Sequence, residues 1–502
     1  MDHPIKRPSF DEHIKSLFEP ADAACMRDRG IDLESYQGLM RDASRISEWI
    51  GSGRMPPPSI GRQWSAEKLQ TFRNWGSNTG FYERAMVRLE QPGTPKTRKS
   101  LHELDETEVE LLKQAFAGIM ARDLDPEDAT SFFNLAGIHW LPGPATNTYC
   151  RHHDDAYNPW HRAYLIAFED ALRTVEGCES VTLPYWDILG EELPDWIYEA
   201  PFFKYSMPHR LSNLSGTEIY DIGYETERFD AQSIVANVIA RSSSIQGSIE
   251  TALASKTWRG FNGWSDWPHQ HEGIIKAHDN GHSVCGRTIS LQDVAAYDPL
   301  FWFFHCNWDR IWWGWQTKED RKTLNRFEEV VSGDRHWLSE APDTLLPPFD
   351  VNSAEMLNLE DWNIEYDTAL HELPVADPIV IASRGHITAS SPFRLPSTEK
   401  LSVRVKNINR LDIPGSFDVV LYAGEHAVDR TRIFQPSSPR ECDNCTQHGT
   451  FSVDFILDKS KLSDQSLRVA IEVDTPSGVM EEVPMQNVGE PTVNVRLLVN
   501  EE

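Results

Sequence analysis

Residues 300–315, with the sequence LFWFFHCNWDRIWWGW, constrain the fold more than any other stretch of the chain. Most of these side chains are large and apolar, so the segment must be buried, and it is long enough to be a helix. The same segment carries His305, Asn307, Asp309 and Arg310. Burying such groups is costly unless their polar atoms have partners. We therefore predict a buried helix whose Asp309 and Arg310 are structural pairing partners that tie neighbouring helices together.

Length and charge narrow the class of protein. The chain has 502 residues, enough for two to four domains, and a net charge of -29, which disfavours nucleic acid and anionic membranes as partners. No apolar run reaches the roughly 20 residues needed to span a bilayer, and the first residues lack the apolar core of a secretory signal. Seven scattered cysteines do not form a disulfide framework. A cytoplasmic protein is predicted.

Three regions follow one another along the chain. Residues 1–95 are predicted to be a helical extension, which has no Cys-x-x-Cys-His motif and is therefore not expected to bind haem. Residues 96–370 contain two windows rich in histidine and tryptophan and are predicted to be mainly helical. From 375 to 502 the apolar period changes to two, as in KLSVRVKNI, SFDVVLYAG, TFSVDFILD, LRVAIEVD and VNVRLLVN. This pattern is typical of a β-sandwich.

The first window places three histidines near helix starts. Asp125 is predicted to cap a helix opened by Pro126, with His139 on its buried face. In HHDDAYNPWHR, Asn158 and Pro159 are predicted to open a second helix that carries His161, and His152 approaches it from a loop.

The second window also places three histidines on predicted helices. His278 and His282 are four residues apart, so they share one helix face and can hold one metal ion. Asp298 and Pro299 are predicted to open the next helix, with His305 on its inner stripe. Any one histidine alone is more often a core residue with satisfied ring nitrogens. Three in each window favour metal binding, and imidazole ligands suit copper, zinc or iron.

The motifs GIHW, CRHH, NPWHRAYLIAFE, LPYWD, HDNGH and YDPLFWFFHCNWDRIWW occur in this order between residues 130 and 316. Together they resemble the type-3 dicopper proteins, which comprise tyrosinases, catechol oxidases and molluscan haemocyanin units. The resemblance, to a bacterial tyrosinase with a C-terminal domain, implies a mainly α fold. It implies a central four-helix bundle holding a dicopper site, after an N-terminal helical extension. A C-terminal all-β sandwich would cover the active site.

Carried over by position, the resemblance implies two copper ions that bind O2 as peroxide. One would be held by His139, His152 and His161, and the other by His278, His282 and His305. Phe304 stands where many members have an additional histidine, but the aligned ligand is His305. Cys150 matches the position of a Cys–His thioether, so a bond from Cys150 to His152 is expected, with a free buried cysteine as the alternative.

The motifs also bear on the catalytic base. Many members have an asparagine after the first histidine of the second copper site, and here that residue is Asp279. Asp279 is a candidate base, with Glu272 as the nearest upstream acid, but Asp279 is equally well explained as a solvated helix residue. The remaining histidines near the motifs are expected to lie at the surface or behind the ligands; they are His153, His269 and His271.

The C-terminal region contains two further candidates. Phe434 precedes Cys442 and Cys445 as in some fungal enzymes, so it is a candidate plug of the copper site; a Phe in the sandwich core is the alternative. The cysteine pair could deliver Cu(I), form a disulfide or be inert.

The resemblance implies a phenol oxidase, and a tyrosinase in particular. Such an enzyme hydroxylates small monophenols at the ortho position with O2 and oxidises o-diphenols to o-quinones. It is latent if the plug is present. A catechol oxidase or o-aminophenol oxidase, or a haemocyanin-like oxygen carrier, are the alternatives. A homo-oligomer is possible, and neither a nucleic-acid nor a membrane partner is expected.

Overall fold

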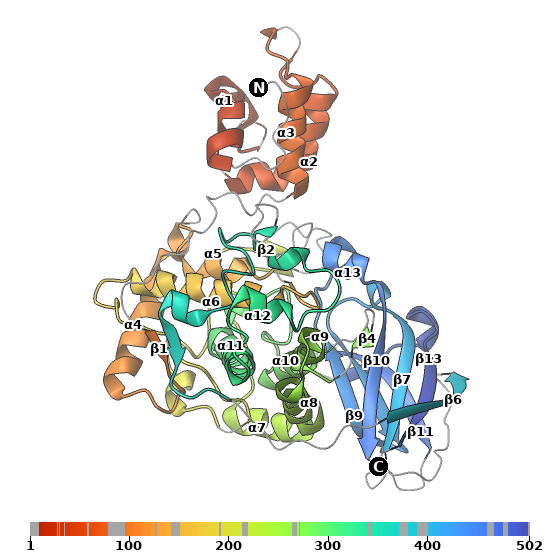
Figure 1. Cartoon of the computed structure of the whole chain (residues 1–502). Coiled ribbons are helices and arrows are strands. Elements are labelled where there is room, and N and C mark those ends of the chain that lie inside the picture. The colour runs from red at the N-terminus through yellow and green to blue at the C-terminus, as the bar shows by residue number, and fades with distance from the viewer. Residues whose placement is uncertain are drawn as a thin grey trace.

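The computed structural model describes the chain except residues 1–9, 28, 30, 35, 58–59, 79–95, 126–127, 142–150, 190–191, 213–218, 264–268, 271, 340–343, 371–379, 389–399, 459–465, 475–479 and 500–502. Figure 1 shows a small group of N-terminal helices, a larger helical body and a C-terminal pair of sheets. The three parts are built around separate hydrophobic cores. The predicted boundaries near residue 95 and between 370 and 375 lie outside the described residues.

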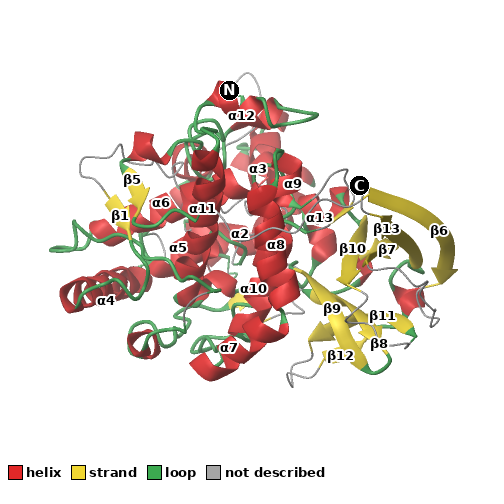
Figure 2. Cartoon of the chain, turned by 60° about the horizontal axis from the view of Figure 1, so that its bottom comes forward, coloured by secondary structure: helices red, strands yellow, loops and turns green. Residues whose placement is uncertain are grey.

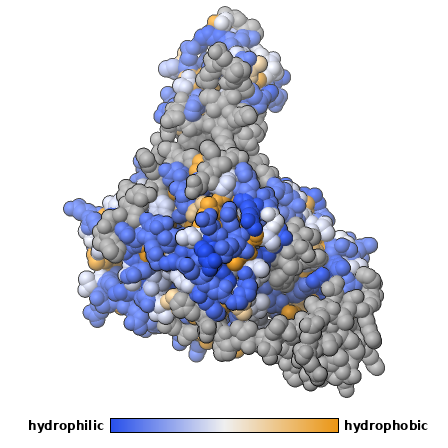
Figure 3. Space-filling model, viewed as in Figure 1, coloured by the Kyte–Doolittle hydropathy of each residue, from blue (hydrophilic) through white to orange (hydrophobic). Residues whose placement is uncertain are grey.

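The N-terminal helices stand apart from the helical body (Figures 1 and 3). They are α1 (Pro20–Arg27), α2 (Tyr36–Gly51) and α3 (Ala66–Asn78), preceded by two short turns, η1 (Phe10–Ile14) and η2 (Lys15–Leu17). Aromatic rings fill their core: Phe72 contacts Trp75 with ring centroids 5.6 Å apart, and both rings are fully buried. This core contains only residues from 10 to 75.

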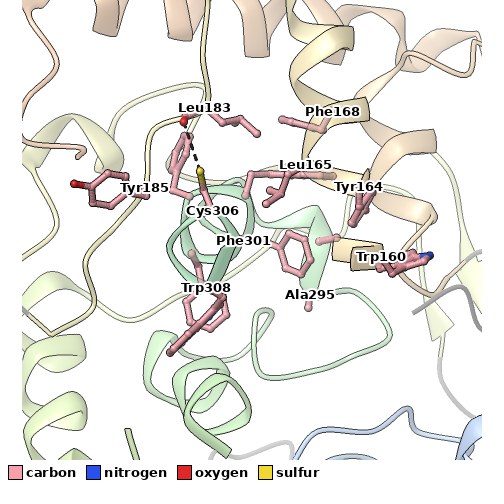
Figure 4. Packing of buried hydrophobic residues seen from close by; sticks show 14 of the residues in the cluster. Trp160, Tyr164, Leu165, Phe168, Leu183, Tyr185, Ala295, Phe301, Cys306 and Trp308 are labelled. Carbon is pink, nitrogen blue, oxygen red and sulfur yellow. Dashed lines mark hydrogen bonds between the residues drawn. The ribbon is translucent and has the colours of Figure 1, made fainter. Parts of the chain in front are cut away.

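The helical body surrounds α11 (Leu300–Lys318), in which every residue from Leu300 to Gln316 is buried. The predicted buried helix is therefore confirmed. Its neighbours include α6 and α8 (Figure 2), and in Figure 4 side chains of α6 such as Leu165 and Phe168 lie beside it. The other helices of the body are α4 (Glu106–Ala121), α5 (Phe132–Gly137), α6 (Tyr157–Arg173), α7 (Ala231–Ala240), α8 (Ser242–Ala254), α9 (Trp258–Asn262), α10 (Ile274–Cys285) and α12 (Leu324–Glu328).

Asp309 ties α11 to another helix, as predicted, and the charged residues of α11 also pair with residues outside the helices. The Asp309 carboxylate accepts hydrogen bonds from Arg162 Nε of α6 at 2.6 Å and from Arg98 NH1 at 3.1 Å. Arg310 donates to Asp187 at 2.8 Å. Arg98 belongs to β1 (Lys96–Arg98), which pairs in parallel with β5 (Ile364–Tyr366). The first and last strands of the helical body, β1 and β5, thus pair with each other and are linked to α11 through Asp309.

Two helix starts differ from prediction, and the start of α11 agrees with it. Helix α5 begins at Phe132, capped by Ser131 and not by Asp125. Helix α6 begins at Tyr157, and the Asn158 amide donates to Asn262 at 2.9 Å instead of capping. Helix α11 begins at Leu300, whose N–H is accepted by Asp298 at 3.0 Å. In α6 a contact with a distant segment takes up the Asn158 side chain, which is then not available as a local cap.

The C-terminal part consists of two sheets with an apolar interior. One has the strand order β4-β10-β7-β13-β6 and the other β12-β11-β8-β9. Alternating apolar residues pair across neighbouring strands, as in Val405 with Val453 and Val493. The strands are β4 (His269–Gln270), β6 (Val380–Thr388), β7 (Lys400–Asn409), β8 (Phe417–Ala423), β9 (His426–Ile433), β10 (Thr450–Asp458), β11 (Leu467–Asp474), β12 (Met480–Glu482) and β13 (Thr492–Val499).

The sheets are docked on the helical body at several points. Strand β4 comes from the helical body and extends the first sheet by pairing in parallel with β10. Strand β9 packs against α10 and α8. The remaining short strands of the body are β2 (Leu211–Ser212) and β3 (Ile219–Tyr220). Among the described helices, none has the length and apolar character to cross a membrane.

Candidate metal centre

The six histidines of the two windows converge between α6, α10 and α11. His161 lies on α6, His278 and His282 on α10, and His305 on α11. His152 precedes α6 in a turn, and His139 follows the end of α5. All six side chains are 5% exposed or less. Segments that are far apart in sequence thus bring their imidazoles into one buried place.

The ring nitrogens form two overlapping groups. His139, His152 and His161 each offer a nitrogen within 4.8 Å of the others, and so do His152, His278 and His282. The His305 ring centroid lies 4.8 Å from that of His161 and 5.0 Å from that of His278. The first group is the predicted one. The second contains His152 in the place predicted for His305, so the assignment of His305 remains a prediction.

Hydrogen bonds orient the ring nitrogens towards the centre. His161 Nδ1 donates to the carbonyl of Tyr157 at 2.8 Å, and His282 Nδ1 donates to the carbonyl of Ile289 at 2.8 Å. His278 Nδ1 lies 2.9 Å from the Asp279 carboxylate. In each case the bonded Nδ1 carries the proton, which leaves the lone pair on Nε2.

The Nε2 atoms then face one another without protons. His278 Nε2 and His282 Nε2 are 2.8 Å apart. The Nε2 atom of His161 and both ring nitrogens of His305 are buried without a hydrogen-bond partner among the described groups. Two lone pairs at this distance repel unless a cation lies between them. The arrangement therefore fits a metal site.

Burial keeps these imidazoles neutral. It lowers the pKa of His139 to about 3, and it lowers the pKa values of His152, His161 and His305 well below the usual range, with neighbouring imidazoles adding to the effect. A neutral imidazole is the form that binds a metal. An all-imidazole set suits copper, so the residues present fit a pair of copper ions.

Asp279 is fully buried, so its interpretation as a solvated helix residue is wrong. Its Oδ1 atom accepts from His278, and Oδ2 lies 2.9 Å from His153 Nε2. Oδ2 also accepts the main-chain N–H of Phe434 at 3.2 Å. Burial raises the pKa of Asp279, but His153 and His278 lower it further, so that the net shift is downward. The carboxylate is therefore ionised at neutral pH.

Glu272 has a different environment. Its carboxylate accepts a hydrogen bond from Lys276 Nζ at 3.2 Å. Lys276 is itself buried and lies 3.9 Å from Asp429 of β9. Glu272 thus belongs to an ion-pair group between α10 and the sandwich, and Asp279 is the carboxylate that touches a candidate metal ligand.

The Phe434 ring lies among the imidazoles. It stacks on His282 with centroids 4.0 Å apart and an interplanar angle of 13°, and its centroid is 5.1 Å from that of His152. Phe434 belongs to the hydrophobic core of the helical body, not to that of the sandwich. The alternative of a sandwich-core residue is therefore wrong. Phe434 directly follows β9, so the end of this strand places its ring at the imidazoles.

The other predicted residues are placed as follows. Cys442 and Cys445 are buried free thiols at the start of α13 (Asp443–Gln447), and Cys442 Sγ accepts the Cys445 N–H at 3.1 Å. Between them, Asn444 donates to the carbonyl of His152. Cys150 and His271 lie outside the described residues, and of His269 only its position in β4 is described.

His153 lies behind the ligands, one of the two places expected for it, whereas Arg410 was not predicted from sequence to take part in this centre. His153 is fully enclosed and contacts Asp279, and Arg410 NH1 lies 3.3 Å from His153 Nδ1. The doubled histidine in CRHHDD was a signal for His153. No local pattern pointed to Arg410, which comes from the sandwich.

Comparisons with known proteins agree with the geometry. Residues 129–318 match the common central domain of tyrosinase. Tyrosinase HcTyr2 of Hahella sp. (strain CCB-MM4) is 24% identical over 479 residues, covering 70% of this chain and 85% of that protein. Hemocyanin G-type of Enteroctopus dofleini is 27% identical over 292 residues, covering 55% of this chain and 9% of that protein.

A solved structure shows the same fold. Tyrosinase from Burkholderia thailandensis superposes with a TM-score of 0.56 and 18% identity, covering 80% of this chain and 100% of that chain.

Proposed function

Because the chain is a tyrosinase-like protein of the type-3 dicopper family, we propose that it is a tyrosinase that hydroxylates monophenols and oxidises o-diphenols to o-quinones with O2. His139, His152 and His161 would hold one copper ion, and His278, His282 and His305 the other. When bound, the two ions would supply the electrons that activate O2. The central observation is the pair of buried imidazole groups, whose unprotonated Nε2 atoms face one another.

The chain's own residues position the substrate. The face of His282 is occupied by the Phe434 ring, so a phenol ring would stack there once Phe434 has left. Asp279 would then accept the phenolic proton on the oxygen released by the Phe434 amide. Phe434 therefore acts as a plug, and the enzyme is latent. The helices that present the histidines, α6, α10 and α11 together with α5 before His139, would form the four-helix bundle of the family.

A diphenol-only enzyme is the second candidate. Both Asp279 oxygens accept hydrogen bonds from histidines, which leaves the carboxylate a poor base. A catechol oxidase or o-aminophenol oxidase, which needs no such base, is consistent with this arrangement. An oxygen carrier is the third candidate function, because the similar protein of Enteroctopus dofleini is a hemocyanin.

Oxygen uptake and quinone absorbance test these functions. Copper-loaded protein is given tyrosine or L-DOPA, with and without SDS or mild acid. Turnover of both substrates, with a lag for tyrosine, is expected. Turnover of L-DOPA alone would identify a catechol oxidase, and reversible O2 binding without quinone would identify a carrier. His305→Ala should lower the copper content to one ion per chain and abolish turnover.

The remaining features belong to the same proposal. The thioether from Cys150 to His152 would hold a ligand that no helix carries, and Cys442 and Cys445 would deliver Cu(I). Small phenols and O2 are the partners of this cytoplasmic enzyme, with self-association possible.

A further inference from the structure

One buried carboxylate accepts hydrogen bonds from three segments of the chain. Asp279 accepts from His278 on its own helix, from His153 in the turn before α6, and from the N–H of Phe434 after β9. The first is a candidate copper ligand, and the last is the main chain of the plug. An ionised carboxylate that is fully buried depends on all its donors, because none can be replaced by water.

His153 is oriented from its other side. Arg410 NH1 lies 3.3 Å from His153 Nδ1, and an arginine can only donate. Nδ1 is therefore the acceptor, and Nε2 carries the proton donated to Asp279 at 2.9 Å. His153 has a φ of 60°, a left-handed conformation that asparagine and glycine also tolerate.

We propose that His153 is a positioning residue that fixes the Asp279 carboxylate, so that one oxygen orients His278 while the other retains the plug through the Phe434 amide. The inference rests on Phe434 being the plug of the proposed function. Without the His153 donor, the carboxylate has fewer hydrogen bonds and is free to turn. Closure of the plug and orientation of His278 are thereby coupled, and each weakens when the other is lost.

Hydrogen exchange of metal-free protein tests this coupling directly. The Phe434 N–H is held across the boundary by Asp279, whereas the next N–H, of Gln435, is held by Ser416 within the sandwich at 3.2 Å. Exchange at these two amides, resolved residue by residue, separates opening of the plug from fraying of the strand end.

The loss variants are His153→Asn and His153→Gly, which suit the backbone but are too short to reach Asp279. His153→Gln replaces the Nε2 donor. We expect about tenfold faster exchange at Phe434 in both loss variants, with no change at Gln435, and recovery in His153→Gln. Using two loss variants guards against misfolding of one of them. His426→Asn, at an exposed histidine of β9, serves as the control and should match the unmodified protein.

Copper binding gives the second measurement. The affinity for the second copper ion should fall in His153→Asn and return in His153→Gln. Unchanged exchange at Phe434 in both loss variants, or exchange in His153→Gln as fast as in His153→Asn, would overturn the proposal. Because the exchange is measured without copper or substrate, this result is independent of whether the protein oxidises phenols.

Discussion

At the residue scale, the buried charged groups Asp309 and Arg310 of α11 are satisfied by partners that are distant in sequence. Asp309 is an example: its two oxygens accept from Arg162 and Arg98, and Tyr366 donates to it at 2.7 Å. The imidazoles of the candidate metal centre differ from Asp309, since several Nε2 atoms face each other without donors. Burying a polar nitrogen without a partner costs on the order of 1–3 kcal/mol, so these atoms mark the place of a ligand.

Removal of the plug should activate the enzyme. Phe434→Ala takes away the ring stacked on His282 and opens that face to a phenol. We expect L-DOPA oxidation without SDS to rise about tenfold, to the level that the unmodified protein reaches with SDS. Phe203→Ala, at a ring that is 48% exposed, is the control and should leave the activity unchanged. A Phe434→Ala protein that still needs SDS would contradict the assignment of the plug.

Asp123 should make stability depend on pH. Burial raises its pKa from 3.8 to about 6. The native state therefore holds this proton more tightly than the unfolded chain, and stability is lost as the pH rises from about 4 to 6. The difference of 2.2 in pKa (6 minus 3.8) corresponds to about 3 kcal/mol.

Asp123→Asn should remove this dependence. The amide oxygen can still accept the Phe133 N–H, and the amide NH2 can face Tyr205. We expect the Tm of the variant to equal that of the unmodified protein at pH 4 and to exceed it at pH 8, as measured by calorimetry. A lower Tm of Asp123→Asn than of the unmodified protein at pH 8 would show that the Asp123 carboxylate stabilises the fold.

At the element scale, Gly281 of α10, which stands between the two histidines of that helix, lies against rings of α11. A Cβ atom there would lie 2.8 Å from a ring carbon of Phe304 and 3.0 Å from Trp308. Both rings are buried in α11 and have little space to move. The position of His278 and His282 relative to α11 thus depends on the absence of a side chain at residue 281.

Two glycine substitutions separate packing from helix propensity. Gly281→Ala should lower the free energy of unfolding by about 1–3 kcal/mol through overpacking and reduce copper loading. Gly247→Ala, in α8, has no atom within 4 Å of the new Cβ and should stabilise the protein by up to about 1 kcal/mol. Thermal unfolding and metal analysis of both variants make the comparison. Equal Tm changes would exclude the close contact.

At the scale of the whole molecule, the sandwich and the helical body share an interface rich in buried charge. Arg241 donates to Asp418 of β8 at 2.7 Å, and Arg432 donates to the same carboxylate at 3.2 Å. The Arg241 and Arg432 charges hold the pKa of Asp418 far below its usual range, although burial opposes the shift. The N-terminal helices differ, because their core contains none of the residues of the body.

Deletion of residues 1–90 should therefore leave the metal centre intact. We expect the same copper content and the same turnover, and one thermal transition fewer if the helices unfold separately. Metal analysis and calorimetry of the shortened chain are the measurements. Loss of copper on deletion would show that the N-terminal helices support the body.

The sequence by itself determined many of the elements and indicated the six histidines as a group. Apolar period predicted α11 and the strands β7, β8, β10, β11 and β13, and the spacing of His278 and His282 placed them on one face, because these patterns are local. It missed β6, β9 and the starts of α5 and α6. It also left open whether Asp279 was solvated and where Phe434 lay.

Only the tertiary structure decided those points. Asp279 meets His153 across 126 residues and Phe434 across 155 residues of chain. Burial and hydrogen bonding at such a separation depend on how the sandwich docks against α10. No local period records that docking, because it is the sum of many contacts between surfaces that are distant in sequence.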